Sequence, residues 1–479
     1  MTDVEEKPPT QQVRVEQILD LLRRHALVES LATRSQLPRH EIVESLVHRQ
    51  NIAELQRHLD DLHAADIATL LESLPINQRL IVWDLVKADR DGEILLEVSD
   101  AVRESLIEHM EVDELVAATE GLDADEIADL APDLPREVMD DVFESLSVDE
   151  REQLRSAMSY EEDSVGALMD FEMISVREDV TLEVVLRYLR RRDELPDHTD
   201  QIFVVDRDEI LKGLLPLNRL LVSEPDRLVR SVMVNDDIVT LQPTQRAEDA
   251  AEAFQRYDLV SAPVVDSTGK LIGRVTVNAV VDYIREESEA DQLSAGGLRE
   301  EEDLFASVWK SVQNRWAWLA VNLVTAFVAS RVIGVFEGSI EKMVALAALM
   351  PIVAGIGGNS GNQTITMIVR AMALGQLAIL NLRQLFLKEI GVAALNGLIW
   401  GSAMGLFAYL IYSKWQLGLV MTAAMMLQLI VAAIMGVTIP VVMHRLGRDP
   451  AVGSSVLITA ITDSGGFFIF LGLATIFLV

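Results

Sequence analysis

The sequence predicts a multi-domain protein: a cytoplasmic all-α helical solenoid, an α/β tandem pair, and an all-α transmembrane domain of five helices. Residues Val13–Met158 have helical periodicity, and a stretch of alternating strands and helices returns after 60 residues. Five long apolar segments fill the last third of the chain. We therefore divide the chain into residues 1–160, 161–290, 291–315 and 316–479.

Charge separates the first 315 residues from the rest of the chain. Before Trp316 there are 70 acidic and 33 basic residues, a net charge of −37, whereas the remainder carries +3. A surface that acidic repels nucleic acid and attracts divalent cations, although many acidic surfaces serve only solubility. Cysteine is absent, which excludes disulfides, thiolate metal sites and cysteine catalysis.

The helical part contains its own repeat. Residues 67–70 and 74–75 match residues 127–130 and 134–135 at an offset of 60. This spacing predicts stacked helical hairpins that form a small acidic solenoid. The polar start Met1–Thr10 lacks the apolar core of a signal peptide, so we expect this part to be cytoplasmic.

The tandem pair is predicted from a second 60-residue offset, which links residues 202–206 and 213–218 to residues 262–266 and 273–278. Each copy has the pattern strand, turn, strand, helix, with Asn218 or Asn278 as the possible helix N-cap. An amphipathic helix precedes each copy, at Leu182–Arg191 and Ala247–Tyr257. We therefore expect two β-α-β-β-α units.

A connecting segment runs from Asp282 to Trp316 and is interrupted only at Gly296-Gly297. Its helical, acidic character allows it to bring carboxylates up to the membrane face. The alternative is a solvated linker helix without a further role.

Flanking charges predict the orientation of the five spans, which are Trp316–Phe336, Met343–Met367, Ile390–Tyr412, Leu417–Met443 and Val452–Leu478. Seven basic residues flank the spans on one side: Lys310, Arg315, Arg370, Arg383, Lys388, Arg445 and Arg448. Only Arg331, Lys342 and Lys414 lie on the other side. Because basic loops stay in the cytoplasm, the N-terminus is expected inside and the C-terminus outside the lipid bilayer.

The second span carries a polar, glycine-rich run over residues 350–364. Backbone without partners is costly at membrane depth, so this run should be buried in protein or face water. Gly357 and Gly361 form a GxxxG step, and close helix packing is an equal explanation for them. The amides of Asn359, Asn362 and Gln363 need partners or a hydrated lumen, which favours a pore.

Asp463 lies about 16 Å from the start of the fifth span, at a rise of ~1.5 Å per residue. A carboxylate at that depth usually faces a water-filled path, so we expect it to contact a permeating cation, with helix packing as the alternative. Ser455 and Thr459 precede it at four-residue spacing, on the same helix face. Their hydroxyls either line a pore or bond back to their own helix.

The two β-α-β-β-α units resemble tandem CBS domains, whose clefts often hold adenine nucleotides, so ATP is a possible ligand of this pair. The whole chain resembles the MgtE family of magnesium channels in its domain order and in the runs 350–364 and 461–467. That resemblance implies a homodimer in the bacterial inner (plasma) membrane, with one central pore. It also implies cytoplasmic domains that bind Mg²⁺ and close the pore, with residues 291–315 as the connecting (plug) helix.

Family motifs are carried over residue by residue. The pore aspartate matches Asp463, and the pore-lining position one turn earlier matches Thr459. The regulatory carboxylates match Glu248, Asp258, Asp282, Glu287, Asp291 and Asp449. The chain departs from the pattern at Asn278, Ala279 and Ala290, which puts the number of regulatory sites in doubt. Asp125 and Asp129, one turn apart, are further candidates.

The sequence and the resemblance together predict a Mg²⁺-selective uptake channel, gated shut by cytosolic Mg²⁺. One alternative is an ion-coupled secondary divalent-cation transporter in which Asp463 takes up a proton. Another is a membrane-anchored adenine-nucleotide sensor, against which the polar second span argues. The sequence contains no P-loop, no H-E-x-x-H motif and no aspartyl-phosphate motif, so we expect no enzyme activity.

Overall fold

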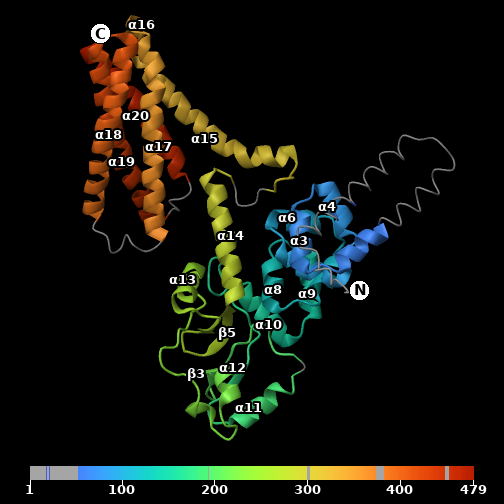
Figure 1. The fold of residues 1–479 in the computed structure, drawn as a ribbon. Coiled ribbons are helices and arrows are strands. Elements are labelled where there is room, and N and C mark those ends of the chain that lie inside the picture. The colour runs from blue at the N-terminus through green and yellow to red at the C-terminus, as the bar shows by residue number, and fades with distance from the viewer. Residues whose placement is uncertain are drawn as a thin grey trace, which may run out of the picture. The chain divides into compact units, whose positions relative to one another are not determined.

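The computed structural model describes residues 18, 21, 52–192, 194–298, 303–373, 382–447 and 453–479. The chain divides into two compact units (Figure 1). The first unit comprises Met1–Glu286 together with Asp303–Ala306, and the second comprises Glu287–Glu302 together with Ser307–Val479. Asp449 lies outside the described residues.

Short helices build the first part of unit one. After a helical stretch at residues 52–60, these are α3 (Ala64–Glu72), α4 (Ile76–Trp83), η1 (Ala88–Arg90), α5 (Asp91–Glu97), α6 (Asp100–Ile107), α7 (Val112–Thr119), α8 (Ala124–Leu130), α9 (Arg136–Ser145) and α10 (Val148–Ala157). Their apolar faces meet in one continuous core. The two copies of the 60-residue repeat occupy equivalent places, because Pro75 and Pro135 are the N-cap residues of α4 and α9.

Two strand-and-helix units follow. The first contains β1 (Ser175–Arg177), α11 (Leu182–Leu189), β2 (Gln201–Val205), β3 (Leu211–Pro216) and α12 (Leu217–Val222). The second contains α13 (Ala247–Tyr257), β4 (Ser261–Val265), β5 (Leu271–Thr276) and α14 (Val277–Ala295). Strand β2 pairs parallel with β1 and antiparallel with β3, and β4 pairs antiparallel with β5.

The two hairpins of these units share their register. Val204 faces Gly213 and Val264 faces Gly273, and each register shifts after that valine. The repeat found in the sequence is therefore a structural repeat as well. The prediction of asparagine N-caps was wrong: α12 begins at Leu217 with Pro216 as its N-cap, and α14 begins at Val277. Asn218 and Asn278 are thus already inside their helices.

Helix α14 begins before the expected connecting element and ends inside it. It runs from Val277 to Ala295, so the predicted boundary at residue 291 falls inside it. The range 291–315 is not one helix, because Gly297 adopts a left-handed φ of +78° and α15 starts only at Val308. A Cβ at Gly297 would lie 2.1 Å from Cε2 of Trp318, so this turn also requires glycine for close packing.

Long helices build the second unit: α15 (Val308–Val335), α17 (Ala345–Ala373), α18 (Leu382–Tyr412), α19 (Trp415–Arg445) and α20 (Ser454–Phe477), with the short α16 (Glu337–Lys342). Helix α19 packs against α17, α18 and α20 (Figure 1). Among the described residues, four helices are long and apolar enough to cross a membrane, namely α15, α18, α19 and α20. The remaining predicted span, the second (Met343–Met367), corresponds to α17, which contains the polar run, and the count of five spans stays a prediction.

Glycines bring α18 and α19 into backbone contact. A Cβ at Gly405 would lie 2.5 Å from the carbonyl oxygen of Gly418, and a Cβ at Gly401 would lie 2.9 Å from that of Thr422. The Thr422 hydroxyl donates to the Gly401 carbonyl at 3.0 Å. The spacing Gly397, Gly401, Gly405 therefore permits a helix pair closer than larger residues would allow.

Candidate functional site

The polar face of α20 is the first part of the candidate site. Ser455, Thr459 and Asp463 follow one another at four-residue spacing; Thr459 is exposed in the single chain, while Ser455 and Asp463 are half-buried. The Thr459 hydroxyl donates to the Ser455 carbonyl at 2.8 Å. Both interpretations of Thr459 are therefore compatible: it bonds back to its own helix, and its oxygen still faces outward.

The polar run of α17 separates into two faces. Gly357 and Gly361 face inward, where a Cβ at Gly361 would lie 2.5 Å from Cγ1 of Ile458 on α20. The packing interpretation of these glycines is thus confirmed. Asn359 and Gln363 are exposed in the single chain, and Asn362 is half-buried. The structure leaves these amides on the outside of a helix that is otherwise closely packed.

Gln428 of α19 is a buried amide that the sequence analysis missed. Its side chain is 1% exposed, and its Nε2 donates to the Thr462 carbonyl at 2.6 Å. A Cβ at Gly357 would lie 2.4 Å from that Nε2, so glycine leaves the room for this amide. Within the described residues, its Oε1 is buried without a hydrogen-bond partner. The available signal was one amide in a span that is otherwise apolar.

Gln428 links three helices next to Asp463. A carbonyl can only accept, so the amide must turn its nitrogen to Thr462. Thr462 is fully buried, and its own hydroxyl donates to the Ile458 carbonyl at 2.8 Å. The carbonyl of the peptide that joins Thr462 to Asp463 is therefore held by a hydrogen bond from α19.

The predicted regulatory carboxylates lie on two helices. Glu248 is in the first turn of α13, and Asp258 caps its end with a φ of +51°. Asp282, Glu287 and Asp291 are all exposed on α14. Within the described ranges, no three Asp, Glu, His or Cys side chains come together as a metal site. A single chain thus supplies oxygen donors on helix surfaces without assembling them.

A different set of carboxylates is gathered at the start of α8. Asp123, Asp125 and Glu126 carry raised pKa values, chiefly because burial disfavours their charged forms. For Asp125, burial and the nearby Asp170 raise the pKa to about 8. Asp125 Oδ1 is buried and has no hydrogen-bond partner among the described residues. Asp170 itself pairs with Arg274 of β5 at 2.7 Å.

The candidates Asp125 and Asp129 have different charged neighbours. Asp129 pairs with the buried Arg103 at 3.4 Å, whereas Asp125 is affected by Asp170. Glu286, late in the first unit, has a pKa raised by burial and then by Asp129 and Asp100. Helix α8 is therefore acidic towards two sides of this unit.

Family models match successive parts of the chain. The model described as the MgtE intracellular N domain matches residues 62–163, and the CBS domain model matches residues 165–223 and 229–286. The MgtE model, described as a divalent cation transporter, matches residues 350–473. The match to this last model includes most of α17, together with Gln428 and Asp463.

Curated relatives resemble the chain over most of its length. A magnesium transporter MgtE from Thermus thermophilus is 31% identical over 88% of this chain and 95% of its own length. One from Bacillus subtilis is 23% identical over 89% of this chain and 94% of its own. A crystal structure of the cytosolic domain of the Mg²⁺ channel MgtE with ATP is 29% identical, covering 50% of this chain and 98% of that one, with a TM-score of 0.45.

Proposed function

Because the chain belongs to the MgtE family of magnesium transporters, we propose that it is a Mg²⁺-selective uptake channel that cytosolic Mg²⁺ closes. The transported ion passes along α20 and α17, and the acidic cytoplasmic domains sense its concentration inside the cell. In this family context the chain is a transporter and has no enzymatic role. The N-terminus lies in the cytoplasm and the C-terminus outside the bacterial inner membrane, as the charge distribution predicts.

The pore proposal rests on Asp463. Magnesium dehydrates reluctantly, so a fast pathway should recognise the hydrated ion through its water molecules. A carboxylate oxygen accepts hydrogen bonds from those waters and supplies negative charge where the lumen is partly desolvated. Thr459, Asn359 and Asn362 add uncharged oxygens on the two helices that flank the same path.

A homodimer completes this pathway. Thr459 and Asn359 are exposed in the single chain, and polar groups are expensive against lipid. A second copy related by a two-fold axis covers them and places two Asp463 carboxylates around one central lumen. The proposal therefore treats these exposed polar side chains as pore surface.

Gln428 is a positioning residue in this proposal. It holds the Thr462 carbonyl and so keeps Asp463 turned towards the lumen, without contact between the amide and the ion. Burial strengthens this role, because Thr462 and Gln428 are shielded from solvent and water does not compete for their hydrogen bond. Losing the amide lets α20 rotate by a small angle that redirects Asp463.

Gating follows from carboxylate repulsion. At low cytosolic Mg²⁺, the charges of Glu248, Asp258, Asp282, Glu287 and Asp291, with Asp449, repel one another and favour an open arrangement. Magnesium bound among them neutralises the repulsion and favours closure, to the extent that it binds the closed state more tightly.

The deciding experiment compares Asp463→Ala with the wild type in liposomes, with internal Mg²⁺ varied. We expect Asp463→Ala to abolish Mg²⁺ flux while dimer and fold persist, and wild-type flux to fall as internal Mg²⁺ reaches millimolar levels. Ser455→Ala is the matched control, about two helical turns away on the same face. Wild-type flux from Asp463→Ala would refute the pore role.

The same preparation tests the rival functions. A secondary carrier would couple Mg²⁺ movement to a proton or sodium gradient and give no single-channel currents. A nucleotide sensor would show no flux and would respond to ATP at the CBS pair. ATP is a possible ligand of the CBS pair, and adding it to the same measurements tests whether it binds there.

A further inference from the structure

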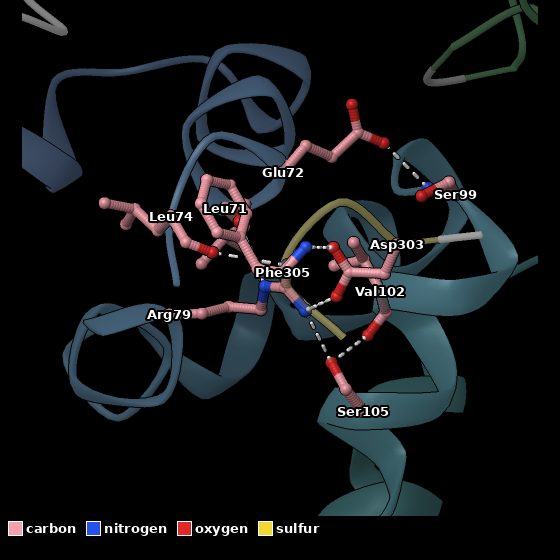
Figure 2. A network of polar contacts seen from close by, with 9 residues as sticks. All are labelled: Leu71, Glu72, Leu74, Arg79, Ser99, Val102, Ser105, Asp303 and Phe305. Carbon is pink, nitrogen blue, oxygen red and sulfur yellow. Dashed lines mark hydrogen bonds and ion pairs between the residues drawn. The ribbon is translucent and has the colours of Figure 1, made fainter. Parts of the chain in front are cut away.

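A buried arginine in the helical domain binds the segment that leads into α15. Arg79 of α4 is fully buried, and its Nη1 pairs with Oδ2 of Asp303 at 2.9 Å, across 224 residues (Figure 2). The same Nη1 donates to the Ser105 hydroxyl at 3.1 Å. The Asp303 side chain is itself only 10% exposed. This ion pair is therefore shielded from water.

The rest of the guanidinium is held by backbone. Nε donates to the Leu71 carbonyl at 3.0 Å and Nη2 to the Leu74 carbonyl at 3.3 Å (Figure 2). Both carbonyls belong to the end of α3 and the turn after it. The arginine is thus fixed in place by the helical domain, with one side left for a carboxylate.

Arg103 of α6 repeats this arrangement 24 residues later. Its Nε donates to the Leu95 carbonyl at 2.9 Å, at the same separation of eight residues that links Arg79 to Leu71. Arg103 takes its carboxylates from within the domain: Asp129 and Asp133, each at 3.4 Å, and Asp100 at 3.5 Å. The only carboxylate paired with Arg79 in the described residues is Asp303.

The binding segment is a compact turn. Asp303 Oδ1 accepts from the backbone of Phe305 at 2.8 Å, and the Asp303 carbonyl accepts from that of Ala306 at 3.1 Å. Ser307, the next residue, is the N-cap of α15, and its hydroxyl accepts from the backbone of Lys310 at 3.3 Å. Few free dihedral angles therefore separate the ion pair from the first turn of α15.

We propose that Arg79 and Asp303 form a latch through which the helical domain acts on α15 directly, independently of the CBS pair. Removing the carboxylate leaves a buried cation without a counter-charge, so binding of the segment and the folded helical domain stabilise each other. When Mg²⁺ moves the helical domain, the latch carries that movement to the start of α15. This inference rests on the proposed Mg²⁺-dependent closure.

Asp303→Asn tests the latch in the full-length dimer, because it keeps the size of the side chain and removes its charge. We expect flux at low Mg²⁺ to stay at the wild-type level, since Asp303 is not in the pore. The Mg²⁺ concentration for half-closure should rise at least about fivefold, the lower range of allosteric couplings. Leu304→Ala is the matched control, because Leu304 is 87% exposed.

A covalent bond should restore the coupling. The protein has no cysteine, so Ser105→Cys and Asp303→Cys introduce two thiols in place of oxygens that contact the same Arg79 nitrogen. We expect the reduced double variant to behave like Asp303→Asn, and the oxidised form to return towards wild-type closure. Failure of the disulfide to form, or equal closure in both forms, would overturn the latch.

A readout without transport separates the latch from the proposed function. Hydrogen exchange of α3 and α4 should speed up in Asp303→Asn and stay unchanged in Leu304→Ala. If wild-type flux does not respond to Mg²⁺, the gating proposal fails, whereas faster exchange still establishes that the segment stabilises the domain. If exchange is unchanged in Asp303→Asn, the latch is refuted whatever the flux shows.

Discussion

The two compact units bury polar side chains in opposite ways. In the cytoplasmic unit the buried polar side chains include Arg79, Arg103 and Arg274, and each pairs with carboxylates. In the other unit they are mainly amide and hydroxyl groups, such as Gln428, Thr462 and Ser339. Glu389 at the start of α18 is the charged exception. Buried charge is thus found mostly in the first unit, where each buried arginine has a carboxylate partner.

Apolar side chains show the same contrast. The helical domain gathers its leucines and isoleucines in one interior cluster. On α15, large apolar residues point outward instead: Leu319 is 63% exposed and Phe327 is 60% exposed. A lipid surface removes the penalty for such exposure, so packing inside this unit depends on close backbone contact and on a few hydrogen bonds.

The largest expected effect is on the buried charge of the cytoplasmic unit. Arg79→Met leaves Asp303 and two backbone carbonyls without their donor, so we expect a loss of about 3–5 kcal/mol in the stability of the helical domain. A denaturant titration in which the hydrogen exchange of α3 is monitored measures this loss of stability. A loss below about 1 kcal/mol would contradict a large contribution of the buried Arg79–Asp303 ion pair to the stability of the helical domain.

Close helix packing in the membrane unit should give a smaller effect. Gly405→Ala places a Cβ 2.5 Å from the Gly418 carbonyl, so α18 and α19 must separate, at about 1–3 kcal/mol. Gly391→Ala on the same helix has no atom within 4 Å of the new Cβ and serves as the control. The melting temperature in detergent should fall only for Gly405→Ala; equal shifts would contradict a specific contact.

The cluster at α8 should make stability depend on pH. Burial raises the pKa of Asp125 from 3.8 to about 8, so folding favours the protonated form. Its stabilisation is complete below about pH 4 and is lost as pH rises to about 8, by at most ~1.4 kcal/mol per pH unit. In Mg²⁺-free buffer, Asp125→Asn should make the free energy of unfolding depend less on pH between about pH 4 and pH 8. An unchanged slope would show that Asp125 is solvated.

The smallest stability effect is expected at Gln428. Gln428→Leu loses one hydrogen bond, so we expect stability to fall by only about 1 kcal/mol. The loss is small because the Thr462 carbonyl remains part of helix α20. Flux should nevertheless fall about tenfold, since a small rotation of α20 redirects Asp463. Gln428→Asn, with a shorter amide, should also fail to restore flux. Normal flux in Gln428→Leu would remove its positioning role.

Local patterns predicted much of the fold. The predicted helix at Ala247–Tyr257 matches α13 residue for residue, because its apolar spacing is strong. The pair Gly296-Gly297 marked the real break after α14, because Gly297 needs a positive φ. The predicted asparagine N-caps were wrong because the helices begin directly after Pro216 and after the strand end at Thr276, two positions before each asparagine.

Contacts between residues far apart in the sequence could not be predicted from local patterns. Asp463 and Thr459 were found from spacing on one helix, and their pore role stays a prediction. Arg79 and Gln428 were missed because their partners lie 224 and 34 residues away. The offset of 24 residues between Arg79 and Arg103 is present in the sequence, but it is a weaker pattern than the 60-residue repeats.

The hydroxyl of Thr459 has a consequence for the sign of the ion that the proposed lumen would admit. Its hydrogen is already given to the Ser455 carbonyl, so an approaching particle meets only lone pairs. Water molecules around a cation point both hydrogens outward and can bond to that oxygen, whereas a water molecule around an anion turns one hydrogen to the ion and has only the other left to donate. In the proposed lumen, Thr459 would therefore favour a hydrated cation while carrying no charge itself.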